Sequence, residues 1–125
     1  MTQTAGVNPK DALGMAKSPL RLVPPALELF AAEAFRDGAE KYGPYNWRQT
    51  NVSTGSYYEA AKRHLDSWWD GEDIDPKSNV HHLAHAAACI AILLDGIAGG
   101  FVVDDRPPPG PAAEIIQNNT RAVGS

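Results

Sequence analysis

The 125-residue sequence is poor in cysteine and has no long uninterrupted apolar run. Its single cysteine, Cys89, excludes an intramolecular disulfide and fits a reducing compartment. The longest apolar run, Ala86 to Leu94, is much shorter than the ~20 residues of a membrane-spanning helix. The N-terminal segment also lacks the apolar core of a signal peptide. These absences predict a cytoplasmic protein without a membrane partner.

Basic residues are also few. The 11 Lys and Arg residues stand against 15 Asp and Glu residues, which gives a net charge of -4. This balance argues against nonspecific nucleic-acid binding, but it leaves room for a small anionic ligand held by a few local cations. The glycines form neither a P-loop nor a dinucleotide fingerprint. No Ser-His-Asp or Cys-His arrangement can be recognised from the spacing.

The chain length predicts one domain with two tails. Residues 1–16 are small and polar without a clear period, so we expect a mobile arm. Residues 17–100 form the predicted domain, and residues 101–125 a proline-rich linker and tail. A compact part of only ~75 to 85 residues buries a limited core, so we expect a homo-oligomer, a dimer or tetramer that shares apolar helix faces.

Apolar periodicity predicts three main helices and hence an all-α helical bundle. The first spans Pro25 to Tyr42, and the second spans Gly55 to Asp70 after an N-cap at Ser53, Thr54 or Ser56. The third begins at Ser78 or Asn79 and ends near Gly96. It is apolar almost all round, which is typical of a helix at the centre of a bundle.

The remaining segments are predicted to be short or irregular. We expect an aromatic elbow at residues 45–48 and a polar loop at residues 49–54. Residues 101–103 suit either a short strand or a packed chain end. Residues 104–111 are too rich in proline for a helix and predict a stiff linker. Residues 112–121 predict a short terminal helix that docks on a neighbouring subunit.

Ionisable side chains concentrate between the second and third predicted helices. Four acids fall within six residues of the intervening loop: Asp70, Glu72, Asp73 and Asp75. Such oxygen donors suit Mg2+ or Mn2+. The alternative is a solvated turn in which Asp75 and Ser78 cap the third helix.

Three histidines open the third predicted helix. His82 and His85 share a face, and both suit either a metal site or hydrogen bonds to the loop carboxylates. A zinc site with Cys89 would lack the usual fourth ligand. The adjacent His81 lies on another face.

The second helix and the elbow add further candidates. Glu59 and Arg63 are four residues apart, so they suit a surface ion pair, or separate contacts with a metal and a phosphate. His64 lies on another face, where we expect a structural role. Trp47 and Asn46 would suit a nucleobase through stacking and paired hydrogen bonds. The alternative is an aromatic plug that closes the bundle.

Three segments together resemble a known family: KSPLRLVPP, GAEKYGPYNW and YYEAAKRHLDSWWDGEDIDPKSNVHHLAHA. The chain from Lys17 to about Leu94 is similar to small phage and bacterial proteins related to the all-α MazG-like nucleoside triphosphate pyrophosphohydrolases. Within that family it most resembles the phage MazZ group of dGTP/dATP diphosphohydrolases.

The resemblance implies an oligomeric helical bundle that uses Mg2+ or Mn2+. It implies that a purine deoxynucleoside triphosphate, dGTP above all, is cleaved to the monophosphate and pyrophosphate. For a phage-encoded protein this would occur in the host cytoplasm and feed 2-aminoadenine nucleotide synthesis. The alternative to this enzyme is a non-enzymic helical module that binds nucleotides or a phage partner.

The wider superfamily carries its metals on an ExxE helix and an ExxD helix, and this sequence departs from both motifs. Only Glu59 matches the first motif, and His82 and His85 stand at the positions of the second. Glu72 and Asp75 are expected to supply the missing oxygens.

The predicted site has three overlapping parts. The expected metal ligands are Glu59, Glu72, Asp75, His82 and His85. The expected catalytic residues are Glu59, Glu72 and Lys41. The expected substrate contacts are Lys17, Lys41, Asn46, Trp47 and Arg63.

Overall fold

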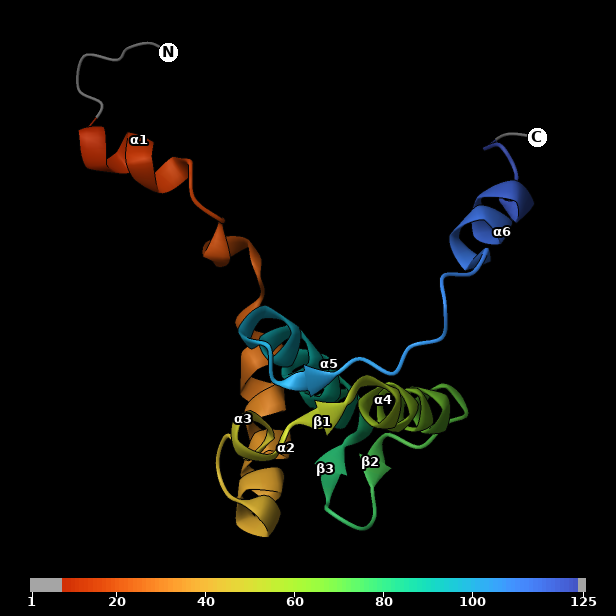
Figure 1. The fold of residues 1–125 in the computed structure, drawn as a ribbon. Helices are drawn as coiled ribbons and strands as arrows, with labels where there is room; N and C mark the ends of the chain where they lie inside the picture. The colour runs from red at the N-terminus through yellow and green to blue at the C-terminus, as the bar shows by residue number, and fades with distance from the viewer. Residues whose placement is uncertain (1–7, 124–125) are drawn as a thin grey trace.

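Helices dominate the computed structural model, which describes residues 8–123 (Figure 1). Its body consists of α2 (Pro25–Tyr42), α4 (Thr54–Trp69) and α5 (His82–Gly99). The α5 helix packs against both of the others and most extensively against α4. The prediction that the apolar third helix lies at the centre is therefore confirmed.

The first two main helices begin and end close to their predicted residues. The α2 helix has its predicted bounds, because Pro25 suits its first turn and Gly43, with a φ of 87°, ends it. Among the three N-cap candidates of α4, Ser53 is the one used. Its side chain accepts a hydrogen bond from the backbone N–H of Ser56.

The predicted start of α5 at Ser78 or Asn79 is wrong. The strands β2 (Ile74–Asp75) and β3 (Val80–His81) form an antiparallel hairpin in front of the helix, and Asn79 takes a positive φ of 60° in its turn. Asp75 and Ser78 therefore do not cap α5. That place belongs to His81, whose side chain accepts a hydrogen bond from the N–H of Leu83.

The prediction of a polar loop at residues 49–54 is also wrong, because two short elements of regular structure lie in this segment. They are α3 (Trp47–Thr50) and the strand β1 (Val52–Ser53). Strand β1 pairs in parallel with β4 (Val102–Val103), which confirms the strand alternative for this segment. The pairing brings Val102 over α5, where a Cβ on Gly96 would lie 2.5 Å from Val102 Cγ1. A side chain at residue 96 would therefore force β4 to shift.

The terminal helices extend away from the body (Figure 1). They are α1 (Pro9–Met15) and α6 (Ala112–Asn119), and none of their residues is buried. The single-turn helix η1 (Leu20–Leu22) lies between α1 and the body. Of the predicted arm, residues 1–7 lie outside the described part. The arm was predicted to have no regular structure, but the described part of it contains the helix α1. The Asn8 side chain caps the first turn by accepting a hydrogen bond from the N–H of Lys10, and Pro9 suits the start of the helix.

The linker before α6 is anchored at its near end. Asp105 Oδ1 accepts hydrogen bonds from Thr54 Oγ1 and Gly55 N, both at 2.7 Å. The carboxylate thus lies at the N-terminus of α4, where the helix dipole favours a negative charge. The α6 helix lies within the predicted residues 112–121.

The buried core is small. Ala34, Ala84 and Ala88 form its cluster, and Phe35 and Val80 pack against it from half-buried positions. Large apolar side chains on α2, α5 and the terminal segments stay exposed. Among the described residues, no large side chain is fully buried.

The α5 helix has the length and composition of a membrane span, with a mean hydropathy of 1.5 over 18 residues. The run from Ala86 to Leu94 therefore understated its apolar length. Within the body, however, α2 and α4 cover two of its sides. His82 and Asp95 also place polar groups near both of its ends. These features favour a core helix of a bundle.

Candidate active site

Three potential metal ligands from three elements come together beside α5. They are His64 on α4, Asp75 on β2 and His82 at the start of α5, and their ligand atoms all lie within 4.8 Å of one another. The two imidazole Nδ1 atoms are 2.9 Å apart. His82 is buried and the other two are half-buried. We call these three residues the His-Asp cluster.

Two further side chains hold the histidines in place. Glu72 Oε1 lies 2.6 Å from His82 Nε2, which leaves Nδ1 of that ring directed at His64. His85 stacks on His64, with ring centroids 4.6 Å apart, and its Nε2 lies 2.7 Å from Ser78 Oγ. The hairpin therefore contributes hydrogen-bond partners as well as Asp75 to this site.

The surroundings shift the pKa values of three side chains at this site, those of His64, Asp75 and His85. Burial lowers the pKa values of His64 and His85, and neighbouring histidines lower them further. The negative charge of Asp75 acts in the opposite direction but does not outweigh burial. Burial alone would raise the pKa of Asp75, but the N–H of Lys77 and the nearby imidazoles outweigh it and lower that pKa. These shifts favour the ionised carboxylate of Asp75 and the neutral imidazole of His64, the forms that bind metals.

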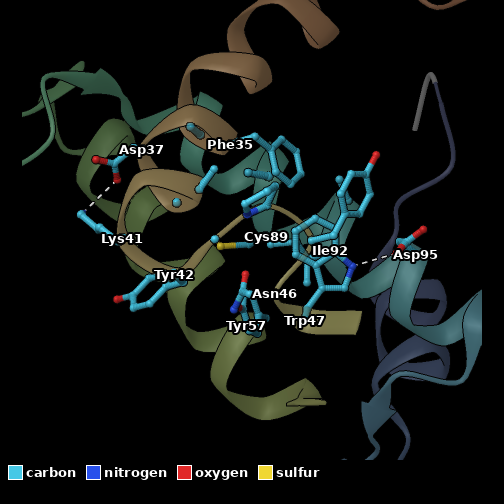
Figure 2. A pocket seen from close by; sticks show the side chains of 18 of the residues that line it. Phe35, Asp37, Lys41, Tyr42, Asn46, Trp47, Tyr57, Cys89, Ile92 and Asp95 are labelled. Carbon is cyan, nitrogen blue, oxygen red and sulfur yellow. Dashed lines mark hydrogen bonds and ion pairs between the residues drawn. The ribbon is translucent and has the colours of Figure 1, made fainter. Parts of the chain in front are cut away.

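A pocket of about 490 Å³ adjoins the cluster between α2, the elbow, α4 and α5 (Figure 2). This volume falls within the range of ~300 to 1,000 Å³ that is usual for small-ligand sites. His85 lines the pocket and also stacks on His64 of the cluster. The His-Asp cluster and the pocket are therefore parts of one site, with His85 between them.

A lysine and an aspartate from α2 line the pocket side facing the cluster. Lys41 Nζ donates to Asp37 Oδ2 at 3.0 Å (Figure 2). This hydrogen bond raises the pKa of Lys41, and the charge of Asp75 adds a smaller effect. Lys41 therefore offers a permanent positive charge within electrostatic reach of the cluster.

Aromatic rings from the elbow form another wall of the pocket. Trp47 is only 7% exposed and lies between Phe35 and Tyr45, with ring centroids 5.7 Å and 5.2 Å away. Its Nε1 donates to Asp95 Oδ2 at 2.7 Å. Arg48 binds both oxygens of the same carboxylate, at 2.9 Å and 2.7 Å. These hydrogen bonds attach the elbow to α5.

Comparison with known proteins assigns the family. The model of the family described as "dATP/dGTP diphosphohydrolase, N-terminal" matches residues 7–106. The chain belongs to this family. A protein of Salmonella phage PMBT28 named dATP/dGTP diphosphohydrolase is 30% identical over 90 residues, which is 72% of this chain and 30% of that protein. The chain thus spans less than a third of the length of this relative. No solved structure matches the chain.

In this member of the diphosphohydrolase family, several predicted residues lie together. Asp75 and His82 are in the cluster, and Glu72 and His85 contact its histidines. Lys41, Asn46 and Trp47 line the pocket.

Other predicted residues lie elsewhere. Glu59 and Arg63 are exposed on α4 and form no ion pair with each other, and Lys17 is exposed ahead of η1. Cys89 lines the pocket but does not belong to the cluster, so it does not extend a histidine site.

Two residues of the site were not among the predicted site residues. His64 was expected to be structural, and the structure brings its Nδ1 within 2.9 Å of His82 Nδ1 in the His-Asp cluster. Its position one turn after the buried Ala61 was the available signal, since residues three and four apart share a helix face. Asp95 was also overlooked, because its partners lie 47 and 48 residues away in sequence.

Proposed function

We propose that the protein is a metal-dependent diphosphohydrolase that converts a purine deoxynucleoside triphosphate to its monophosphate and pyrophosphate. The proposed substrate is dGTP, and the monophosphate would feed 2-aminoadenine nucleotide synthesis in a phage. One observation carries the proposal: His85 both lines the pocket and stacks against the His-Asp cluster. A ligand whose base fills the pocket would thus direct its phosphates toward the cluster. The name of the family and of the phage relative supports the same reaction.

The His-Asp cluster offers the donor set of a divalent-metal site. Nδ1 of His64 and Nδ1 of His82 lie 2.9 Å apart, which is a hydrogen-bond distance, and Asp75 adds a carboxylate oxygen within 4.8 Å of both. A bound ion would take the place of the proton that the two rings share. Imidazole donors favour Mn2+ over Mg2+, so we propose Mn2+ as the better cofactor. When bound, this ion would neutralise phosphate charge and activate the attacking water.

The residues of the chain would then divide the remaining work. Asp75 and the two histidines of the cluster would hold the ion, and Glu72 would orient His82 through its contact with Nε2. Lys41 would exchange its bond to Asp37 for a phosphate oxygen, because a phosphate carries more charge than a carboxylate. These contacts position and stabilise charge, which are the main tasks in phosphoryl transfer.

The base would be held by the elbow. Trp47 supplies apolar ring surface, and Asn46 supplies a donor and an acceptor at the pocket. Arg63 and Lys17 remain proposed phosphate contacts, and Glu59 remains a proposed metal ligand. All three are exposed in the single chain, so these roles require a neighbouring subunit that brings them to a site.

We further propose that the working form is a homo-oligomer, a dimer or tetramer. A compact monomer of 13.4 kDa exposes about 6,500 Å² of surface, but this chain exposes 9963 Å². Large apolar side chains such as Phe30 on α2 and Leu94 and Ile97 on α5 contribute to the excess. Contacts between subunits would remove this apolar surface from water.

A product assay tests the proposal. The protein is incubated with each of the eight common nucleoside triphosphates, with Mn2+, with Mg2+ or with EDTA, and the products are separated by anion-exchange chromatography. We expect dGMP and pyrophosphate from dGTP, faster with Mn2+ and absent with EDTA. Release of single orthophosphate would contradict the cleavage position. Binding of dGTP without any product would favour the non-enzymic nucleotide-binding alternative.

A further inference from the structure

Asp95 lies outside the His-Asp cluster but connects two walls of the pocket. It is on α5, whereas both of its partners, Trp47 and Arg48, are on α3. One carboxylate thus accepts three hydrogen bonds, from the Trp47 indole and from two nitrogens of Arg48, at 2.7 to 2.9 Å. Charge-assisted bonds of this length are among the stronger ones in proteins. The same carboxylate lines the pocket (Figure 2).

The backbone of the elbow gives it little stability of its own, so an anchor on α5 restrains it in addition to the packing of Trp47. Tyr45 takes a positive φ of 56°, which is unfavourable for a bulky side chain. The α3 helix has only four residues, too few to be stable alone. The Arg48 guanidinium also lies 4.5 Å from the centre of the Tyr45 ring, so the arginine that binds Asp95 holds this ring as well.

We propose that Asp95 is a positioning residue for the nucleobase. Through Trp47 and Arg48 it fixes the orientation of the indole and the neighbouring Asn46, and so sets the affinity for the base without touching the phosphates or the metal. This inference rests on the proposed function, because it assumes that the pocket holds the base. Disrupting the anchor should then weaken nucleotide binding and leave the chemical step at the cluster almost unchanged.

The test uses Asp95→Asn, with Asp104→Asn as its matched control. Asp104 also accepts bidentate hydrogen bonds from an arginine, Arg106, but it does not line the pocket. Both variants are made in a Trp68→Phe, Trp69→Phe background, which leaves Trp47 as the only tryptophan of three. KM and kcat for dGTP with Mn2+ are measured, together with acrylamide quenching of Trp47 fluorescence.

We expect Asp95→Asn to raise KM by about 10-fold, with kcat within about 3-fold, and to make Trp47 more accessible to quencher. Asp104→Asn should match the background protein in all three readouts. Arg48→Lys keeps the positive charge, removes the bidentate contact and should raise KM by a smaller factor. It serves as the deciding variant if Asp95→Asn does not fold.

Two results would overturn the positioning role. One is an Asp95→Asn protein whose KM and quenching equal those of Asp104→Asn, and the other is a fall in kcat at unchanged KM. The proposed function fails separately, when the background protein binds dGTP but releases no pyrophosphate. In that case the dissociation constant for dGTP, measured from Trp47 fluorescence, replaces KM as the readout for Asp95.

Discussion

Asp75→Asn tests the His-Asp cluster most directly, because it separates a metal ligand from a turn residue. In the structure Asp75 Oδ1 accepts a hydrogen bond from the N–H of Lys77 at 2.9 Å. Asparagine retains this acceptor, so the hairpin and the metal-free fold should survive. The substitution removes the only carboxylate among the three ligands of the cluster. Its effect should therefore appear only when metal is present.

The expected magnitude follows from the charge that is lost. Two unit charges about 4 Å apart attract by about 1 kcal/mol in water and about 4 kcal/mol at a protein surface. A loss of affinity of about 100-fold, or about 2.7 kcal/mol, lies within this range. With Mn2+ at about 100 times the wild-type Kd, wild type gains about 2.7 kcal/mol of stability and the variant about 0.4 kcal/mol. For a chain of this size these gains raise Tm by about 10 °C and about 2 °C.

Differential scanning fluorimetry with and without Mn2+ measures these shifts. Asp73→Asn is the matched control, because it removes the same charge from the same loop but Asp73 is not in the cluster. We expect the control to keep the wild-type shift. Equal Mn2+-induced shifts in wild type and Asp75→Asn would refute the metal site. A fall in Tm of several degrees without metal would assign Asp75 a structural role instead.

Three further predictions concern catalysis, assembly and pH. Glu59→Gln should lower kcat by about 100-fold while the Tm without metal stays constant; turnover near the wild-type rate would leave Glu59 as a surface charge only. Light scattering should give a mass of two or four chains, and a 13.4 kDa particle at assay concentration would contradict the shared apolar surface. Because folding lowers the pKa of His64 and of His85, their contribution to stability is complete above pH ~6.5 and is lost as pH falls through their folded values. The metal-free Tm should therefore decline between pH ~6.5 and 5, and less steeply in a His64→Gln, His85→Gln protein; equal slopes would contradict the burial of these rings.

Local sequence patterns predicted the helical body well. The stripe of α2, the Ser53 cap and the apolar character of α5 are all encoded within single segments. The errors occurred where local signals competed. An apolar and histidine-rich segment suggested that α5 begins before Val80, but pairing of this residue with Asp75 across the hairpin determines the actual start. Strand pairing of this kind depends on contacts that periodicity does not describe.

The candidate site was predicted in part for the same reason. Asp75, Glu72 and His82 are close in sequence, so their proximity in space could be anticipated. His64 joins them only through the packing of α4 against α5, and Asp95 meets the elbow only because α3 folds back on α5. Side-chain type and spacing identify candidate residues, whereas the helix packing decides which of them meet.

The alanine core has a consequence for how substrate choice can change. Two of its three members, Ala34 and Ala88, also line the pocket. The side chain of alanine is a single methyl group, so nearly every substitution at these two residues introduces a larger side chain. The larger side chain pushes α2 away from α5. The same movement would alter the width of the pocket. In this protein, mutations that broaden or shift nucleotide selectivity at these two residues should also lower stability, so new specificities are more accessible through the elbow than through the core.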